Sequence, residues 1–180
     1  LRVQQQENTN TSIVLGALDD IDQWQMEVHI TPTAAGIASI QFSNIFETVD
    51  GKFAWNKYRK NGGTEPPQDE LYLLTSQNVV HQQTKPVLGA FQVNINDQKL
   101  SLTSASDWKT VETTSSSAEF VAIIIDGKQN KIASIRRKWT LNSQYGLHLE
   151  QSVLNLTSQE MSVQWLQYGP PTLTVDRSRY

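Results

Sequence analysis

"KIASIRRKWTLNSQYGLHLEQSVLNLTSQEMSVQWLQYGPP" (residues 131–171) alternates apolar and polar residues in three consecutive segments. Alternation of this kind is typical of β-strands that bury one face. In the first segment, one face is apolar except for a single arginine, and its members are Ala133, Ile135, Arg137, Trp139 and Leu141. We therefore expect Arg137 to lie among apolar neighbours on the buried face.

The second and third segments extend this pattern. The second covers residues 145–156, and a change of phase near Ser152 predicts a β-bulge or a strand that switches sheets. The third covers residues 161–169. The intervening stretches "NSQYG" and "NLTSQE" are rich in turn-forming residues, so we expect the three strands to form a meander.

The rest of the chain has the same organisation. Further strands are predicted at residues 12–18, 24–31, 36–44, 70–76, 88–95, 98–104, 107–114 and 118–125. About ten to twelve short strands with regular turns indicate an all-β fold, specifically an antiparallel β-sandwich. We expect one domain over residues 12–180, preceded by a linker or domain boundary over residues 1–11.

Residues 47–70 are the one long stretch without strand periodicity. The pairs Gly62-Gly63 and Pro66-Pro67 in this stretch argue against a continuous helix or a central strand. No amphipathic helical pattern of twelve residues is evident along the chain. The sequence therefore predicts a loop at residues 47–70.

Composition excludes several classes of function. The 180 residues include no Cys, which rules out a thiol nucleophile, a Cys-ligated zinc and an iron-sulfur site. The net charge of -3 and the lack of a long basic run argue against nucleic-acid binding. The longest apolar run, "FVAIII", is far shorter than the roughly 18 residues that cross a bilayer. We expect a water-soluble, polar-surfaced domain.

The sequence offers little for catalysis or metal binding. His29, His81 and His148 lie far apart in the sequence. Only His148 has a possible second ligand nearby, because Glu150 follows two residues later on the same face of the predicted strand. The run "DDID" lacks the Gly and the distal Glu of an EF-hand loop and is better explained as a solvated turn. We therefore predict that the domain is not an enzyme and needs no cofactor or metal.

The aromatic and basic residues give one candidate binding site. Trp24, Trp139 and Trp165 are in phase with apolar neighbours and are predicted to be core residues, whereas Trp55 is predicted to be exposed. The stretch around Trp55 also holds the chain's only basic cluster. The candidate partner-binding residues are Lys52, Trp55, Lys57, Tyr58, Arg59 and Lys60. A solvated loop without function is the alternative.

Three stretches together resemble the periplasmic domain of the YidC family of bacterial membrane-protein insertases. They are "IVLGALD", "WQMEVHITPTAAGIASIQFSNIFETVDG" and "IRRKWTLNSQYGLHLEQSVLNLTSQEMSVQWLQYGPPTL". The third is similar to the family's basic-aromatic-Thr-Leu entry, Tyr-Gly turn, long strand ending near Asn and closing strand before Gly-Pro. The opening and closing motifs are most similar to planctomycete members.

The resemblance implies a β-supersandwich similar to galactose mutarotases, located in the periplasm and tethered to the inner membrane. It implies an accessory binding or scaffolding role, with Sec translocon components, nascent membrane proteins or the membrane surface as partners. A carbohydrate-binding or mutarotase-like sandwich is the alternative, and it would require exposed aromatic platforms with converging carboxylates and His. A generic adhesion or interaction sandwich is a third interpretation.

Overall fold

The computed structural model describes residues 1–7, 11–63, 70–76, 78–80, 83–142 and 144–169. It contains one α-helix, α1 (Val49–Lys60), and two short 3-10 turns, η1 (Thr33–Ala35) and η3 (Ala105–Asp107). The strands are β1 (Arg2–Val3), β2 (Ile13–Gly16), β3 (Met26–Thr31), β4 (Gly36–Phe46), β5 (Leu71–Ser76), β6 (Asn78–Val80), β7 (Gln83–Lys85), β8 (Ala90–Ile95), β9 (Gln98–Ser101), β10 (Lys109–Thr113), β11 (Ser117–Ile125), β12 (Lys131–Leu141), β13 (Leu147–Asn155) and β14 (Val163–Gln167).

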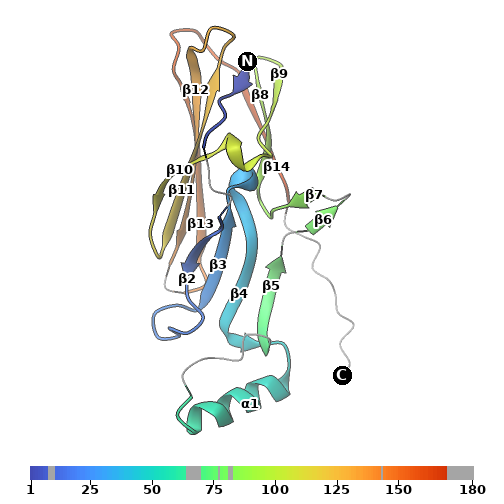
Figure 1. Ribbon diagram of the computed structural model, residues 1–180, viewed down its shortest axis with the longest axis vertical. Helices are drawn as coiled ribbons and strands as arrows, with labels where there is room; N and C mark the ends of the chain where they lie inside the picture. The colour runs from blue at the N-terminus through green and yellow to red at the C-terminus, as the bar shows by residue number, and fades with distance from the viewer. Residues whose placement is uncertain (8–10, 64–69, 77, 81–82, 143, 170–180) are drawn as a thin grey trace.

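Every strand pairing in the described chain is antiparallel. The largest sheet has five strands in the order β1-β11-β12-β13, with β10 paired to another part of β11. The other sheets are β2-β3-β4-β5, β14-β8-β9 and the small hairpin β6-β7. Figure 1 shows the five-stranded sheet along one side of an elongated molecule, with the β2–β5 and β8–β9–β14 sheets on its other side. The prediction of a β-rich, antiparallel fold is confirmed.

One continuous hydrophobic core joins these layers. It includes Val28 and Ile30 of β3, Val93 and Ile95 of β8, and Ile135 of β12, all of which are inaccessible to solvent. On the inward face of β12 every residue from Ala133 to Leu141 is buried, including Arg137. The alternation in the opening stretch therefore predicted the correct buried face.

A close backbone approach fixes how β2 meets β3 and β12. Gly16 has a φ of +76°, and a Cβ there would lie 2.2 Å from the carbonyl oxygen of Met26 and 2.8 Å from the Leu141 side chain. The Gly16 N–H donates to the Ser115 carbonyl oxygen at 2.8 Å, across to the other layer. Only glycine combines this conformation with this contact distance.

Two topological predictions for residues 131–171 are wrong. The predicted irregularity near Ser152 is absent, because β12 and β13 pair in unbroken register from Ala133–Asn155 to Leu141–Leu147. The third strand of the predicted meander, β14, pairs with β8 instead of β13 and so belongs to another sheet. Hydrophobic periodicity identifies a strand and its buried face, but it does not identify the strand beside it.

The first residues also differ from expectation. Arg2 and Val3 pair with Ile125 and Ile124 as β1, although no periodic structure was predicted before residue 12. A strand of two residues is too short to produce an alternating pattern. It extends the five-stranded sheet next to the end of β11.

Candidate functional site

The predicted binding segment contains a helix, so the prediction of a loop over residues 47–70 is wrong for its first half. Thr48 caps α1, because its Oγ1 accepts the Gly51 N–H at 2.9 Å. Asp50 lies in the first turn and Lys57, Arg59 and Lys60 lie in the last, as the helix dipole favours. Gly62 follows the helix at a φ of +86°. The glycine pair therefore ends this helix, while Pro66-Pro67 lie outside the described residues.

Trp55 holds α1 in place and is not the exposed aromatic that the sequence predicted. Its side chain is only 5% exposed. Its ring stacks on Tyr58 with centroids 5.7 Å apart, and the Arg59 guanidinium lies 5.8 Å from the indole centroid. The Arg59 guanidinium and the Tyr58 ring therefore cover the indole, and no strand partner is needed. Tyr58 and Arg59 thus pack against Trp55, and the Trp55 side chain is not accessible to a partner.

The opposite side of α1 carries an exposed stripe, which we define as Val49, Phe53, Lys57 and Lys60. These positions are three or four residues apart and therefore share one face of the helix. Val49 is 70% exposed and Phe53 is 67% exposed. Lys52 lies beside the stripe and is exposed as well. Sequence reasoning found the lysines but missed Val49 and Phe53, whose spacing of four residues was the available signal.

The stripe lies at one end of the molecule. Figure 1 shows α1 below the β4 and β5 strands, at the end opposite the β8–β9 and β11–β12 turns. The helix contacts the remainder of the fold through β4. An apolar centre surrounded by lysines on an exposed helix can bind a surface that is both anionic and partly apolar.

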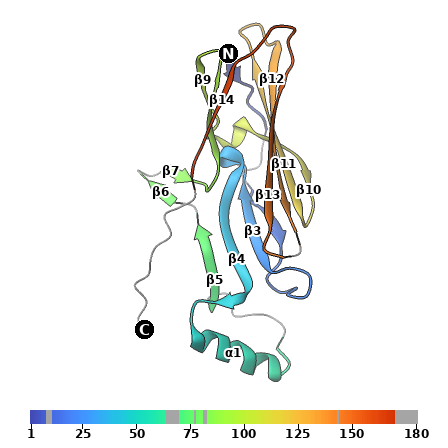
Figure 2. The ribbon, with the colours of Figure 1, turned by 180° about the vertical axis from the view of Figure 1, so that it is seen from behind.

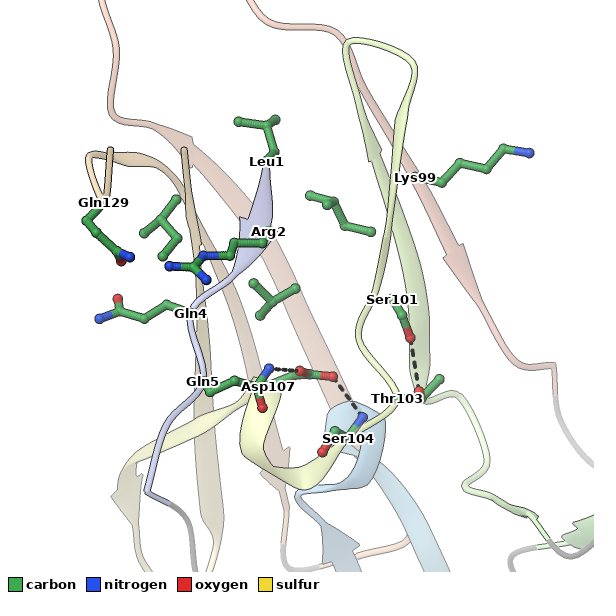
Figure 3. A pocket seen from close by; sticks show the side chains of 13 residues that line it. Leu1, Arg2, Gln4, Gln5, Lys99, Ser101, Thr103, Ser104, Asp107 and Gln129 are labelled. Atoms are coloured by element: carbon green, nitrogen blue, oxygen red, sulfur yellow. Dashed lines mark hydrogen bonds between the residues drawn. The ribbon is translucent and has the colours of Figure 1, made fainter. Parts of the chain in front are cut away.

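A cleft lies far from this helix, between β1, β9 and η3. Its volume is about 740 Å³. Figure 3 shows Asp107 in it, and the Asp107 carboxylate accepts the Ser104 N–H and the Gln5 side-chain N–H, both at 2.8 Å. Asp107 is therefore engaged in capping η3, and its lone pairs are directed at structural partners. The lining of the cleft mixes apolar residues such as Leu100 and Ile125 with hydroxyls such as Ser101 and Thr103.

The candidate metal ligands are not brought together. Within the residues that the structure describes, no group of three or more His, Asp and Glu side chains could hold a metal ion. Asp20 of the "DDID" run accepts the Gln23 N–H at 3.2 Å, as a turn residue does. His81 lies outside the described residues. No helix in the described part of the chain is long and apolar enough to cross a membrane.

Among the described residues, a His–carboxylate contact is formed by a pair that was not predicted from the sequence. His29 and Glu27 lie two residues apart on β3, with Nε2 and Oε1 separated by 2.7 Å. The hydrogen bond to Glu27 raises the pKa of His29 above 6.5, against an opposing effect of burial. The pair links two neighbouring side chains of one strand face and has no third partner for chemistry.

This pair predicts a small pH dependence of stability. Because the pKa of His29 is raised in the folded state, its contribution is complete below pH 6.5 and disappears as the pH rises through the folded value. The side chains are 36% and 22% exposed, so we expect a few tenths of a kcal/mol, about the value of a surface ion pair. Urea midpoints between pH 5 and 9 should fall more for the native chain than for Glu27→Gln. Parallel curves would contradict this.

The comparisons with known proteins assign no family. No family model matches the chain, and no curated protein matches it. We therefore infer the function from the fold, the exposed stripe and the resemblance in the sequence.

Proposed function

We propose that this chain is a periplasmic accessory domain of a YidC-type membrane-protein insertase, with a β-supersandwich arrangement similar to that of galactose mutarotases. In this role it binds or scaffolds and catalyses no reaction, and it is tethered to the bacterial inner membrane. Its partners are the membrane surface, Sec translocon components and nascent membrane proteins. The antiparallel folding of the strands that carry the resemblance supports this proposal.

The exposed stripe of α1 is the observation that carries the binding role. Phe53 and Val49 offer apolar area, and Lys52, Lys57 and Lys60 surround them with positive charge. Each Lys near an anionic bilayer contributes about 1 kcal/mol. The chain as a whole has a net charge of -3, so attraction to anionic lipid depends on this local arrangement. Anionic headgroups are accordingly the surface that the stripe fits best.

The carbohydrate-binding alternative has less support. It needs exposed aromatic rings as stacking platforms, preferably indoles. Trp24, Trp55, Trp108 and Trp139 are buried, and Trp165 is half-buried. Only Trp165 among these five residues offers a sugar part of an indole face, in the groove that it lines with Val163 and Gln151.

We predict that changing Lys52, Lys57 and Lys60 to Ser weakens binding to phosphatidylglycerol-containing vesicles. Three lost contacts of about 1 kcal/mol each set an upper value of about a hundredfold, and about tenfold is expected with salt screening. Vesicle co-sedimentation at low and physiological salt measures the change.

A matched variant separates the stripe from net charge. Lys99, Lys128 and Lys131 are exposed at the opposite end of the molecule, and changing them to Ser alters the net charge equally. We expect this variant to bind like the native chain. Equal loss in both triple variants, or no binding by the native chain, would contradict membrane binding through α1. The insertase assignment is tested separately by the gene, which should encode one apolar span before Leu1 and about five after Tyr180.

A further inference from the structure

Strand β13 presents an unprotected sheet edge. Its register with β12 is unbroken. The Asn142 N–H donates to the Gly146 carbonyl and the Leu156 N–H to the Ile132 carbonyl, and these two bonds show which residue pairs along the two strands are hydrogen-bonded to each other. Even-numbered residues of β13 therefore bond to β12, and the N–H and C=O groups of Leu149, Gln151 and Val153 point away from it. In the described chain no strand pairs with this edge.

Strand β14 ends the neighbouring sheet in the same way. The Asn96 N–H donates to the Ser162 carbonyl, so by alternation the backbone groups of Val163 and Trp165 point away from β8. Both strands lie toward the viewer in Figure 2. Between them is a groove of about 300 Å³, lined by Gln151, Ser152, Val153, Val163 and Trp165. Two free edges thus border one groove.

The sheet register places Gln151, which lines this groove, opposite Arg137, a buried cation that has no counter-charge among the described residues. Arg137 has no exposed surface, and its Nη2 donates to the Leu88 carbonyl at 2.6 Å. Its Nε and Nη1 have no hydrogen-bond partner among the described residues. Burial lowers the pKa of Arg137 to about 9. A guanidinium in such a place has two donors available for an acceptor, and a carboxylate matches its geometry.

The path from the groove to Arg137 passes a pair of carboxamides. Gln151 lies opposite Arg137 in the sheet register, in a pair without mutual backbone hydrogen bonds, where side chains approach most closely. The Gln151 Nε2 donates to the Gln167 Oε1 of β14 at 3.2 Å. Both glutamines are exposed, and they lie on the edge strands of two different sheets, Gln151 on β13 and Gln167 on β14. This hydrogen bond can therefore open without disturbing the core.

We propose that the groove between β13 and β14 binds an extended polypeptide segment that adds to the free edge of β13 and directs an Asp or Glu side chain to Arg137. The edge supplies main-chain hydrogen bonds and the groove receives alternate side chains, as in other cases of strand addition. The unpaired guanidinium selects the carboxylate. Strand β13 also lacks Pro and Lys, which commonly protect an edge strand from pairing.

The test uses the acetylated and amidated peptide TVTETVT and its Gln analogue TVTQTVT, titrated into the native chain by calorimetry and amide NMR. We expect the Glu peptide to bind about tenfold more tightly than the Gln peptide, with shifts concentrated at Leu149–Val153 and Val163–Trp165. Arg137→Met should remove the discrimination between the two peptides.

Selective N-methylation tests the backbone geometry without changing the protein. The inward-facing residues of β13 direct their backbone N–H and C=O groups to the free edge. In an antiparallel pair, the peptide residues opposite them also face inward, and these are the two Val and the Glu. The two Val N–H groups of the peptide therefore face β13. Methylation of both Val nitrogens should abolish binding, whereas methylation of the two Thr nitrogens that flank Glu should preserve it.

Several results would overturn the proposal. Equal binding of the Glu and Gln peptides would exclude a carboxylate site, and no binding of either at millimolar concentration would exclude strand addition. Binding of acetate alone with no peptide binding would indicate a small-anion site. A concentration-dependent mass of the native chain, lost in Val153→Pro, would assign the edge to a second copy. None of these outcomes depends on vesicle binding by α1.

Discussion

Replacing Trp139 by Ala is expected to lower the free energy of unfolding by about 4 kcal/mol. The side chain is 1% exposed and belongs to the core shared by the layers. Truncation of a buried indole costs about 3 to 5 kcal/mol through lost burial and the cavity left behind. The indole N–H also donates to the Ala35 carbonyl at 3.0 Å, so the mutation leaves a buried acceptor without its partner.

Urea unfolding followed by far-UV circular dichroism measures this effect. Two comparisons calibrate it. Phe53→Ala removes an aromatic ring that is 67% exposed and should change the free energy of unfolding by less than about 0.5 kcal/mol. Trp165→Ala removes a half-buried indole and should fall between the two. A Trp139→Ala midpoint equal to that of Phe53→Ala would mean that the inward face of β12 is misassigned.

The sequence predicted strands well where a strand buries one face and exposes the other. Strands β11 and β12 alternate in this way over nine and eleven residues, and Trp139 and Arg137 lie where the alternation puts them. Trp165 was also predicted to be a core residue, but it is only half-buried. Its face is inward, as expected. The strand lies at a sheet edge beside an open groove, and edge position is not encoded in local periodicity.

The structure of the candidate binding segment differs from the prediction, whereas its role in binding stays a prediction. The basic cluster drew attention to residues 52–60, but α1 has a weak apolar pattern because only Gly51 and Trp55 are buried on it. A helix that buries one indole lacks the repeated spacing by which helices are recognised. Trp55 was consequently predicted to face solvent, and Phe53 was passed over. The Thr48 cap was the local signal that favoured a helix.

The groove beside β13 could not have been predicted, because it depends on which strands are neighbours. Gln151 and Gln167 are unremarkable polar residues in the sequence, and they meet only because β14 joins β8. Arg137 was expected among apolar neighbours, and that expectation is confirmed. Whether a carboxylate lies near Arg137 depends on the tertiary structure, so the lack of a counter-charge among the described residues could not be predicted from the spacing of residues in the sequence.

Arg137→Met is expected to raise the free energy of unfolding by about 1 to 3 kcal/mol. A buried charge without a partner carries a desolvation cost, and replacement of buried ionic groups by apolar side chains of similar volume is often stabilising by about 1 to 4 kcal/mol. The loss of the hydrogen bond to the Leu88 carbonyl offsets about 1 kcal/mol of this gain. The variant also loses a cation–π attraction between Arg137 and the Trp139 ring, whose centroid is 5.6 Å away, and this loss offsets even less of the gain.

The pH dependence distinguishes this explanation from a packing effect. Burial lowers the pKa of Arg137 from its ordinary value to about 9, so above pH 9 the unfolded chain binds more protons than the folded one. Native stability should therefore rise with pH relative to Arg137→Met, and the advantage of the variant should shrink between pH 8 and pH 10. Arg136→Met is the matched control, because Arg136 is exposed and pairs with Glu119 at 2.6 Å. Its unfolding midpoint should lie close to that of the native chain at either pH.

A loss of more than about 2 kcal/mol in Arg137→Met would show that the native guanidinium is already well accommodated, and the argument for a missing carboxylate would fail. A gain in stability together with loss of Glu-peptide binding would instead support a missing carboxylate at Arg137. Arg137 would then be a residue that the fold holds at a cost in stability, because its two unpaired nitrogens, Nε and Nη1, serve a partner that enters between β13 and β14.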